Sequence, residues 1–228
     1  MHYLLTHLDD AWRLTLVHLR LSLLPVLTGL AIAVPVGVLV QHSPIARRLT
    51  TTIASVVFTI PSLALFVVLP MIIGTRILDE FNVMAALTAY TAALLVRAVL
   101  EALDAVPAQV RDAAIAVGYP PLTRMLKVEL PLSIPLLVAG LRVVVATNIA
   151  MVSVGSVIGI GGLGTWFTEG YQTDKSSEIF AGIIAVFALA IAIDALIVLV
   201  GRSATSWVRA ARTTGRRSVV APVVGGAR

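Results

Sequence analysis

The chain has 228 residues, of which 58% are hydrophobic and only 13% are charged, and its formal net charge is +5. Soluble domains usually contain about 45–50% apolar and about 25% charged residues, so this composition excludes an ordinary soluble domain and indicates a membrane protein. The chain has no cysteine, which excludes disulfides and thiolate metal sites. Its four histidines show no metal-ligand spacing, so we expect no metal site.

Five apolar stretches of the chain are long enough to cross a bilayer. Roughly 20 apolar residues suffice for a helical span, and only a helix satisfies its own backbone hydrogen bonds in lipid. The sequence therefore predicts an all-α membrane protein with about five transmembrane helices. The expected spans are residues 17–40, 51–73, 82–100, 132–156 and 178–200. They divide the chain into an N-terminal segment, a transmembrane domain and a basic tail, at residues 1–16, 17–200 and 201–228.

Prolines fall inside several of these spans, at Pro25, Pro35, Pro61 and Pro135. Proline is tolerated in a span when neighbouring groups or water satisfy the carbonyl that it leaves free. Each of these prolines is interpreted either as a plain kink or as a broken helix beside a cavity. The second interpretation fits a transporter.

Lysine and arginine are divided unevenly between the two sets of connecting segments. The set that includes the C-terminal tail carries 12 of them, and the other set carries 4. Basic segments stay in the cytoplasm, so we expect the amino end outside and the carboxyl end inside. This topology accounts for the basic charge without a nucleic-acid partner. We expect the tail to be disordered and to touch anionic lipid, and Trp12, Trp166 and Trp207 to lie near the membrane interfaces.

The longest predicted cytoplasmic loop covers residues 101–131. Its alanines favour helix, Gly118 permits a turn, and Tyr119-Pro120-Pro121 cannot continue a helix. A second short helix is predicted over 122–129, and Pro131 opens the next span. The sequence therefore predicts a helix, a sharp turn and a second, short helix in this loop. On composition alone it would be interpreted as a solvated connection between spans, which most multi-pass proteins have.

The spacing of residues in this loop favours a docking element. Asp112-Ala113-Ala114, three residues, Gly118, nine residues, Val128, one residue and Leu130-Pro131 follow one another. This pattern resembles the cytoplasmic loop signature of permease subunits in binding-protein-dependent ABC importers, with Asp in place of Glu and Val in place of Ile. The resemblance implies a type I ABC importer permease fold. It also implies an ATPase-coupling role for Asp112, Ala113, Ala114, Gly118, Arg124, Leu130 and Pro131.

Three further stretches resemble the permeases that import osmoprotectants such as glycine betaine, choline and carnitine. They are the segments 59–70, 139–145 and 159–164, and the resemblance covers about residues 15–200. That group commonly has glutamine where this chain has Phe58. Methionine-type permeases carry a similar glycine-rich turn, so an importer of another small solute, such as an amino acid, is the alternative.

The resemblance also implies the partners of the chain. They would be ABC ATPase subunits, a second copy of the permease or a paralogue, an external substrate-binding protein and membrane lipid. The chain has no Walker sequence, so it is expected not to be an enzyme and to hold no cofactor. ATP and magnesium would bind to the partner ATPase. The implied location is the bacterial cytoplasmic, or inner, membrane.

Polar residues inside the spans are the remaining candidates for function. Arg142 and Asp194 lie at comparable depth, and a charge in a span costs at least roughly 2.5–3.5 kcal/mol. We therefore interpret them as an intramembrane pair, with substrate contact or separate partners as alternatives. Tyr90, Asn148 and Ser153 are pathway candidates because polar groups in spans face cavities or helix contacts.

The glycines of the segment 159–164 formally match a dinucleotide-binding fingerprint. Such a site needs a strand–helix–strand unit, and here a span precedes the glycines. We interpret Gly159, Gly161, Gly162 and Gly164 as an external turn or gate where backbones pack closely. Two other classes of protein fit the sequence less well. An ion-coupled carrier needs acidic residues in several spans, and a membrane scaffold leaves the loop spacing unexplained.

Overall fold

The computed structural model describes residues 2–205, and these residues form helices joined by short connections. The predicted tail beyond Thr205, with Trp207, lies outside the described residues. The helices are α1 (His2–Thr6), α2 (Leu8–Val40), α3 (Pro44–Thr59), α4 (Ser62–Ile73), α5 (Glu80–Asp104), α6 (Ala108–Ala116), α7 (Pro121–Arg124), the π-helical η1 (Met125–Glu129), α8 (Leu130–Gly155), the 3₁₀ turn η2 (Ser156–Ile158), α9 (Thr165–Gln172) and α10 (Ser176–Ala204).

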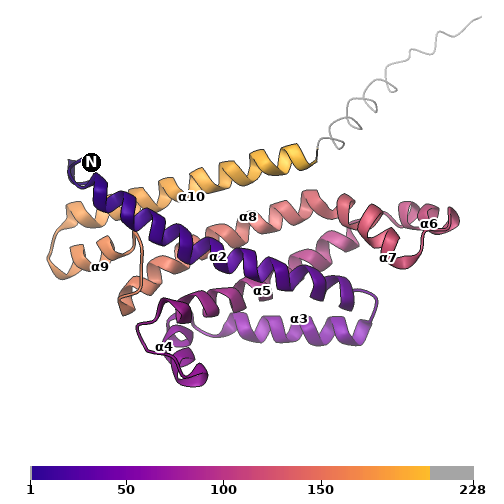
Figure 1. The fold of residues 1–228 in the computed structure, drawn as a ribbon, viewed down its shortest axis with the longest axis horizontal. Coiled ribbons are helices and arrows are strands. Elements are labelled where there is room, and N and C mark those ends of the chain that lie inside the picture. The colour runs from indigo at the N-terminus through magenta and orange to yellow at the C-terminus, as the bar shows by residue number, and fades with distance from the viewer. Residues whose placement is uncertain (1, 206–228) are drawn as a thin grey trace, which may run out of the picture.

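Helix α5 forms the centre of the bundle, with α2, α3, α4 and α8 packed around it (Figure 1). Two glycines of α2 allow the closest of these contacts. A Cβ atom added at Gly29 would lie 2.4 Å from the Thr91 side chain, and one at Gly37 would lie 2.5 Å from Val99. The helices therefore approach more closely than larger residues would permit, as is common where helices pack in membranes.

The predicted spans are confirmed at four long helices. Helices α2, α5 and α10 and the continuous segment from Pro121 to Ile158 are each long and apolar enough to cross a membrane. Pro25 and Pro35 lie inside α2, and Pro135 lies inside α8, without ending either helix. None of the residues in the most apolar stretch of α10 is buried, so this helix lies on the outside of the described chain.

The second predicted span was wrong as a single helix. Helices α3 and α4 meet at a bend of 103°, at Ile60 and Pro61. A proline disfavours helical geometry in the residue before it, and Ile60 accordingly takes an extended conformation with ψ of 129°. Proline also lacks the N–H that would continue the hydrogen-bond ladder. The span is therefore broken in its middle.

The loop at residues 101–131 also differs from expectation in its second half. The segment after Pro120 does not stop before the next span but runs continuously from Pro121 to Ile158 over 38 residues. Pro131 cannot donate a helical hydrogen bond, and the π-helical turn η1 precedes it. There the N–H of Leu130 donates to the Met125 carbonyl, five residues back.

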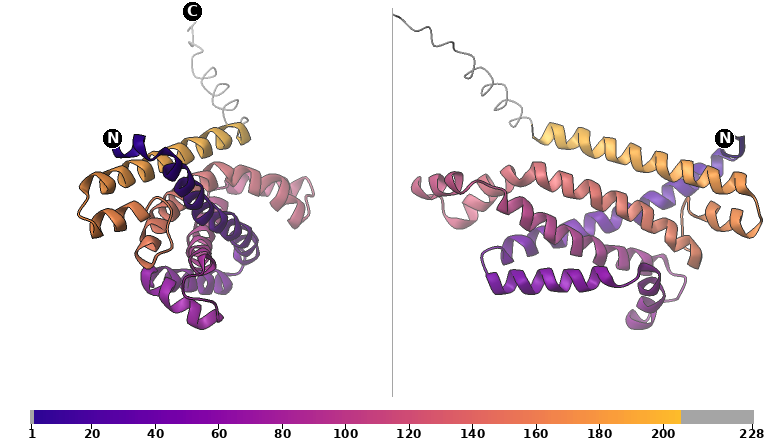
Figure 2. Two further views of the ribbon diagram at one scale, coloured as in Figure 1. Left: turned by 60° about the vertical axis from the view of Figure 1, so that its left-hand side comes forward. Right: turned by 180° about the vertical axis from the view of Figure 1, so that it is seen from behind.

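The connections divide between the two ends of the bundle. Helices α6 and α7 project from one end, beyond the ends of α5 and α8 (Figure 1). Helix α9 and the start of α2 lie at the opposite end, and the view from behind shows the same arrangement (Figure 2). The predicted grouping of the connecting segments into two opposite sets thus agrees with the path of the chain.

Candidate coupling segment and transport path

The turn after α6 has the geometry of a left-handed helix cap. Gly118 has φ of +88°, a value that glycine adopts without the steric cost of a side chain. Its N–H donates to the Ile115 carbonyl at 2.9 Å, and the Tyr119 N–H donates to the Ala114 carbonyl at 3.0 Å. This pair of bonds is a Schellman motif, which satisfies the last carbonyls of a helix and reverses the chain. The sequence-predicted turn at Gly118 is thereby placed between α6 and α7.

The surface of this coupling segment, residues 108–126, is largely exposed. Asp112, Ala113 and Gly118 are all exposed, whereas Ala114 is buried. Large apolar side chains are exposed beside them at Ile115, Val117, Leu122 and Leu126, and Val117 is 77% exposed. An exposed apolar surface rimmed by polar groups marks a site of protein or membrane contact.

A buried carboxylate anchors the coupling segment to the rest of the bundle. Glu129 is fully buried and accepts a hydrogen bond of 2.7 Å from Nε of Arg124. Nε of Arg111 lies 3.8 Å from the other oxygen, and the Arg111 guanidinium also reaches carbonyls at the end of α5. Glu129 thus ties α6 and α7 to the start of α8, where Leu130 and Pro131 are half-buried. Sequence reasoning assigned Glu129 no role, because its burial depends on the tertiary fold.

The two charged residues of the fourth and fifth spans lie together. Nε of Arg142 donates to Oδ1 of Asp194 at 2.6 Å, and Nη2 donates to Oδ2 at 2.8 Å. The paired side chains join α8 to α10 and remain about 40% exposed on the described chain. Arg142 also lines a hollow of about 190 Å³ between these helices.

The three pathway candidates have different surroundings. The Tyr90 hydroxyl donates to the Ile60 carbonyl at 2.7 Å, and the Asn148 amide donates to the Thr91 hydroxyl at 2.6 Å. Both side chains are buried, and their hydrogen bonds join α5 to the end of α3 and to α8. Ser153 differs, because its buried hydroxyl has no hydrogen-bond partner among the described residues. It lines a hollow of about 680 Å³ beside α9 and the start of α10.

The glycine-rich turn lies at the α9 end and packs against two spans. Gly162 faces the backbone of α2, where an added Cβ would lie 2.7 Å from the His18 Cα atom. Gly164 faces α8 in the same way, at 2.7 Å from the Ser153 Cα atom. His18 is fully buried here, and its Nε2 lies 2.9 Å from the Ile149 carbonyl. The turn therefore packs tightly against both α2 and α8. His18 is part of this contact, and no local sequence signal had indicated it.

Two carboxylates approach each other at the same end of the bundle. Glu178, in the first turn of α10, is buried, and Glu169 lies on α9. Partial burial raises the pKa of Glu169 above its ordinary range, and the negative charge of Glu178 raises it further. Within residues 2–205, no three His, Asp or Glu side chains are arranged to hold a metal ion.

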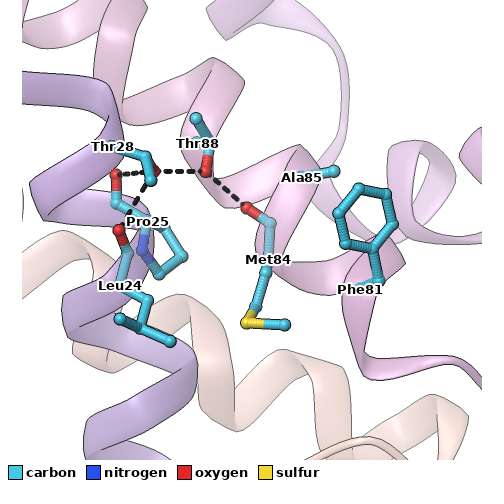
Figure 3. Close-up of a pocket in the computed structure, with 7 residues that line it drawn as sticks. All are labelled: Leu24, Pro25, Thr28, Phe81, Met84, Ala85 and Thr88. Carbon is cyan, nitrogen blue, oxygen red and sulfur yellow. Dashed lines mark hydrogen bonds between the residues drawn. The ribbon is translucent and has the colours of Figure 1, made fainter. Parts of the chain in front are cut away.

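Another hollow, of about 460 Å³, lies between α2 and α5 (Figure 3). Its walls are apolar except for two hydroxyls, those of Thr28 and Thr88, which bond to each other at 2.9 Å. The Thr88 hydroxyl also donates to the Met84 carbonyl. None of the residues that line this hollow is charged, so it offers no charged partner to a solute.

A bundle of helices long and apolar enough to cross a membrane, with a segment projecting from one end, is the architecture of a multi-pass membrane subunit. Residues 33–210 match the family described as "Binding-protein-dependent transport system inner membrane component". The match covers most of the chain, and the chain belongs to this family. It is therefore a multi-pass inner-membrane permease subunit of an ABC importer.

Individual relatives agree with this family. The chain is 34% identical to the osmoprotectant import permease protein OsmW of Salmonella typhimurium, over 86% of this chain and 93% of the relative. It is 31% identical to the carnitine transport permease protein OpuCB of Listeria monocytogenes, over 78% of this chain and 80% of the relative. A chain of the methionine ABC transporter MetNI, in an inward-facing conformation, superposes with a TM-score of 0.76 at 25% identity. That superposition covers 90% of this chain and 98% of the other.

Proposed function

We propose that this chain forms one half of the membrane pathway of an ATP-driven importer for a small osmoprotectant, such as glycine betaine, choline or carnitine. The observation that carries the proposal is the projecting coupling segment. Its turn at Gly118 is left-handed, its apolar surface is exposed, and the buried Glu129, which follows it in the chain, ties it to α8. Those are the properties of a segment that transmits movement from a bound partner.

The partner at this segment is a cytoplasmic ATPase subunit. Seven basic residues of the described chain lie at or near this end, and basic segments stay in the cytoplasm. They are Arg47, Arg48, Arg97, Arg111, Arg124, Lys127 and Arg202. The amino end then lies outside and the carboxyl end inside. ATP and magnesium bind to the ATPase, a second permease copy or paralogue completes the pathway, and an external binding protein delivers the solute near α9.

Movement would pass from the ATPase to the spans through rigid elements. When the ATPase dimer closes on ATP, the coupling segment moves with it. Glu129 and the continuous helix from Pro121 to Ile158 carry the movement into α8. The ion pair between Arg142 and Asp194 then carries it to α10. The spans rock as nearly rigid bodies and expose the pathway to the other side of the membrane.

Two observations bear on which class of solute is carried and on whether ATP or a proton gradient drives the transport. The relatives named for osmoprotectant and carnitine transport are 34% and 31% identical, whereas the methionine transporter chain is 25% identical. Sequence similarity thus favours an osmoprotectant over an amino acid. A proton-coupled carrier is disfavoured because Asp194, the acidic residue in the interior of a predicted span, is already bound to Arg142.

Uptake by the reconstituted complex tests the proposal. The chain is assembled in proteoliposomes with its ATPase and its binding protein, and accumulation of labelled glycine betaine, choline or carnitine is measured with and without ATP. We expect accumulation of at least one of these solutes only with ATP, ATPase and binding protein together. Accumulation that persists without ATP or without the ATPase would contradict the proposal.

A further inference from the structure

The break between α3 and α4 lies at an exposed part of a predicted span. The hydrogen-bond ladder of α3 ends where the Ile60 N–H donates to the Val57 carbonyl, and that of α4 begins where the Leu65 N–H donates to the Pro61 carbonyl, so the ladder is interrupted between them. The residues around the break, Phe58, Thr59, Ile60 and Pro61, are all exposed on the described chain. Broken backbone at membrane depth is tolerated only where protein buries it or where it lines a water-filled cavity. This face of the chain therefore does not face lipid tails.

Polar groups continue along the same face toward the coupling end. Nη2 of Arg97 on α5 donates to the Ser55 hydroxyl on α3 at 3.0 Å. Arg97 lies seven residues before the end of α5, or about 10 Å along the helix. A charged side chain at that position in a lipid-facing surface is costly. We name this strip, with Ser55, Phe58, Ile60, Tyr90 and Arg97, the α3–α5 seam.

An aromatic ring stands at the break itself. Phe58 is 43% exposed and makes an edge-on contact with Tyr90, with ring centroids 6.0 Å apart and planes at 87°. Tyr90 is fixed because its hydroxyl donates to the Ile60 carbonyl at the break. The ring of Phe58 is thus held in place while part of its surface stays open. Aromatic faces attract quaternary ammonium ions, most strongly where water is partly excluded.

The guanidinium of Arg97 reaches α3 about one helical turn before Phe58. Arg97 is bonded to Ser55, and Ser55 precedes Phe58 by three residues, which is about 4.5 Å along a helix. An aromatic ring and a guanidinium one turn apart match the two ends of a small zwitterion. The ring would face the cationic end, and the guanidinium, which pairs well with carboxylates, would face the anionic end.

We propose that the α3–α5 seam is a solute-contact site for zwitterionic quaternary-ammonium compounds. Phe58 contacts the ammonium group, and Arg97 contacts the carboxylate. The proposal rests on the proposed function, because it assumes that the solute passes through this subunit. It adds a preference for carboxylate-bearing betaines over choline, whose alcohol group has no charge to offer Arg97.

The absence of cysteine from the chain permits a direct test. A Thr59→Cys variant, which places a thiol beside Phe58, is assembled in the complete complex in nanodiscs. The rate at which its thiol reacts with a charged, water-soluble methanethiosulfonate reagent is measured without solute and with glycine betaine or choline. It is also measured with 3,3-dimethylbutyrate, the analogue of glycine betaine in which an uncharged tert-butyl group replaces the ammonium group. The exposed Leu27→Cys on α2 serves as the comparison thiol.

We expect the Thr59→Cys thiol to react, and glycine betaine to slow its reaction far more than 3,3-dimethylbutyrate does. Adding Phe58→Leu should raise the half-protecting concentration of glycine betaine and of choline by about fivefold. Adding Arg97→Gln should raise the half-protecting concentration of glycine betaine and leave the half-protecting concentration of choline unchanged. The control Phe187→Leu, which removes an even more exposed ring from α10, should change neither half-protecting concentration.

Three results would overturn the inference. They are an unreactive Thr59→Cys thiol, a reaction that glycine betaine does not slow, and protection that survives Phe58→Leu. ATP-driven uptake by the same Thr59→Cys complex is measured in parallel. If uptake occurs and protection fails, the contact site is wrong and the proposed function stands. If the wild-type complex fails to transport, the proposed function itself is wrong.

Discussion

Arg142 and Asp194, which are 52 residues apart, lock α8 to α10 through two parallel hydrogen bonds. The fork of the guanidinium matches the two carboxylate oxygens, so orientation and distance are both fixed. Because both groups lie within predicted spans, either one alone would leave an unpaired charge in the membrane.

The first prediction concerns this pair. Arg142→Gln and Asp194→Asn should each lower ATP-driven uptake several-fold, because each leaves one charge without its partner. The double swap Arg142→Asp with Asp194→Arg should recover most of the lost uptake. Uptake in proteoliposomes, normalised to the amount of folded complex, is the measurement. A swap that performs no better than the single variants would show that the pair does not act as a clamp.

The second prediction concerns the anchor of the coupling segment. Glu129→Ala should loosen α6 and α7, because removing one partner of a buried ion pair typically costs about 3–5 kcal/mol. ATP hydrolysis should continue while uptake falls, and trypsin should cut faster at Arg111 and Arg124 than in wild type. Glu101→Ala, which removes an exposed carboxylate at the end of α5, is the control. Equal rates of cleavage in the two variants would refute the anchoring role of Glu129.

The third prediction concerns pH. The folded pKa of Glu169 is raised, so its neutral form is favoured in the fold. Its contribution to stability is therefore complete below the unfolded value of about 4.3 and is lost as pH rises through the folded value. Between pH 4 and 8, the melting temperature of wild type should fall relative to that of Glu169→Gln. If the melting temperatures of wild type and Glu169→Gln change by the same amount between pH 4 and 8, the effect is ruled out.

The sequence was most informative where a local property decides the structure. The spans follow from apolar length, and the turn after α6 follows from Gly118 and the two prolines behind it. The proximity of Arg142 and Asp194 follows from counting helical rise in two spans. Each of these depends on residues that are near one another in the chain or on a fixed geometry of the helix.

The sequence was least informative where tertiary contacts decide. Pro25 and Pro61 look alike in the sequence, yet one lies inside α2 and the other ends α3. At Pro61 the freed Ile60 carbonyl meets the Tyr90 hydroxyl, which is 30 residues away, so the break is stabilised. The burial of Glu129 and of His18 likewise depends on helices that meet only in the folded chain. No local pattern carries that information.

The most direct test of the account compares two glycines with the same backbone conformation. Gly118 and Gly74 have φ of +88° and +73°, and an added Cβ would meet nothing within 4 Å at either. Substitution by aspartate should therefore cost each a similar backbone strain of roughly 1–2 kcal/mol. Only Gly118 lies in the coupling segment. We predict that Gly118→Asp abolishes ATP-driven uptake while membrane insertion stays intact, and that Gly74→Asp largely retains uptake. Normal uptake by Gly118→Asp would contradict it.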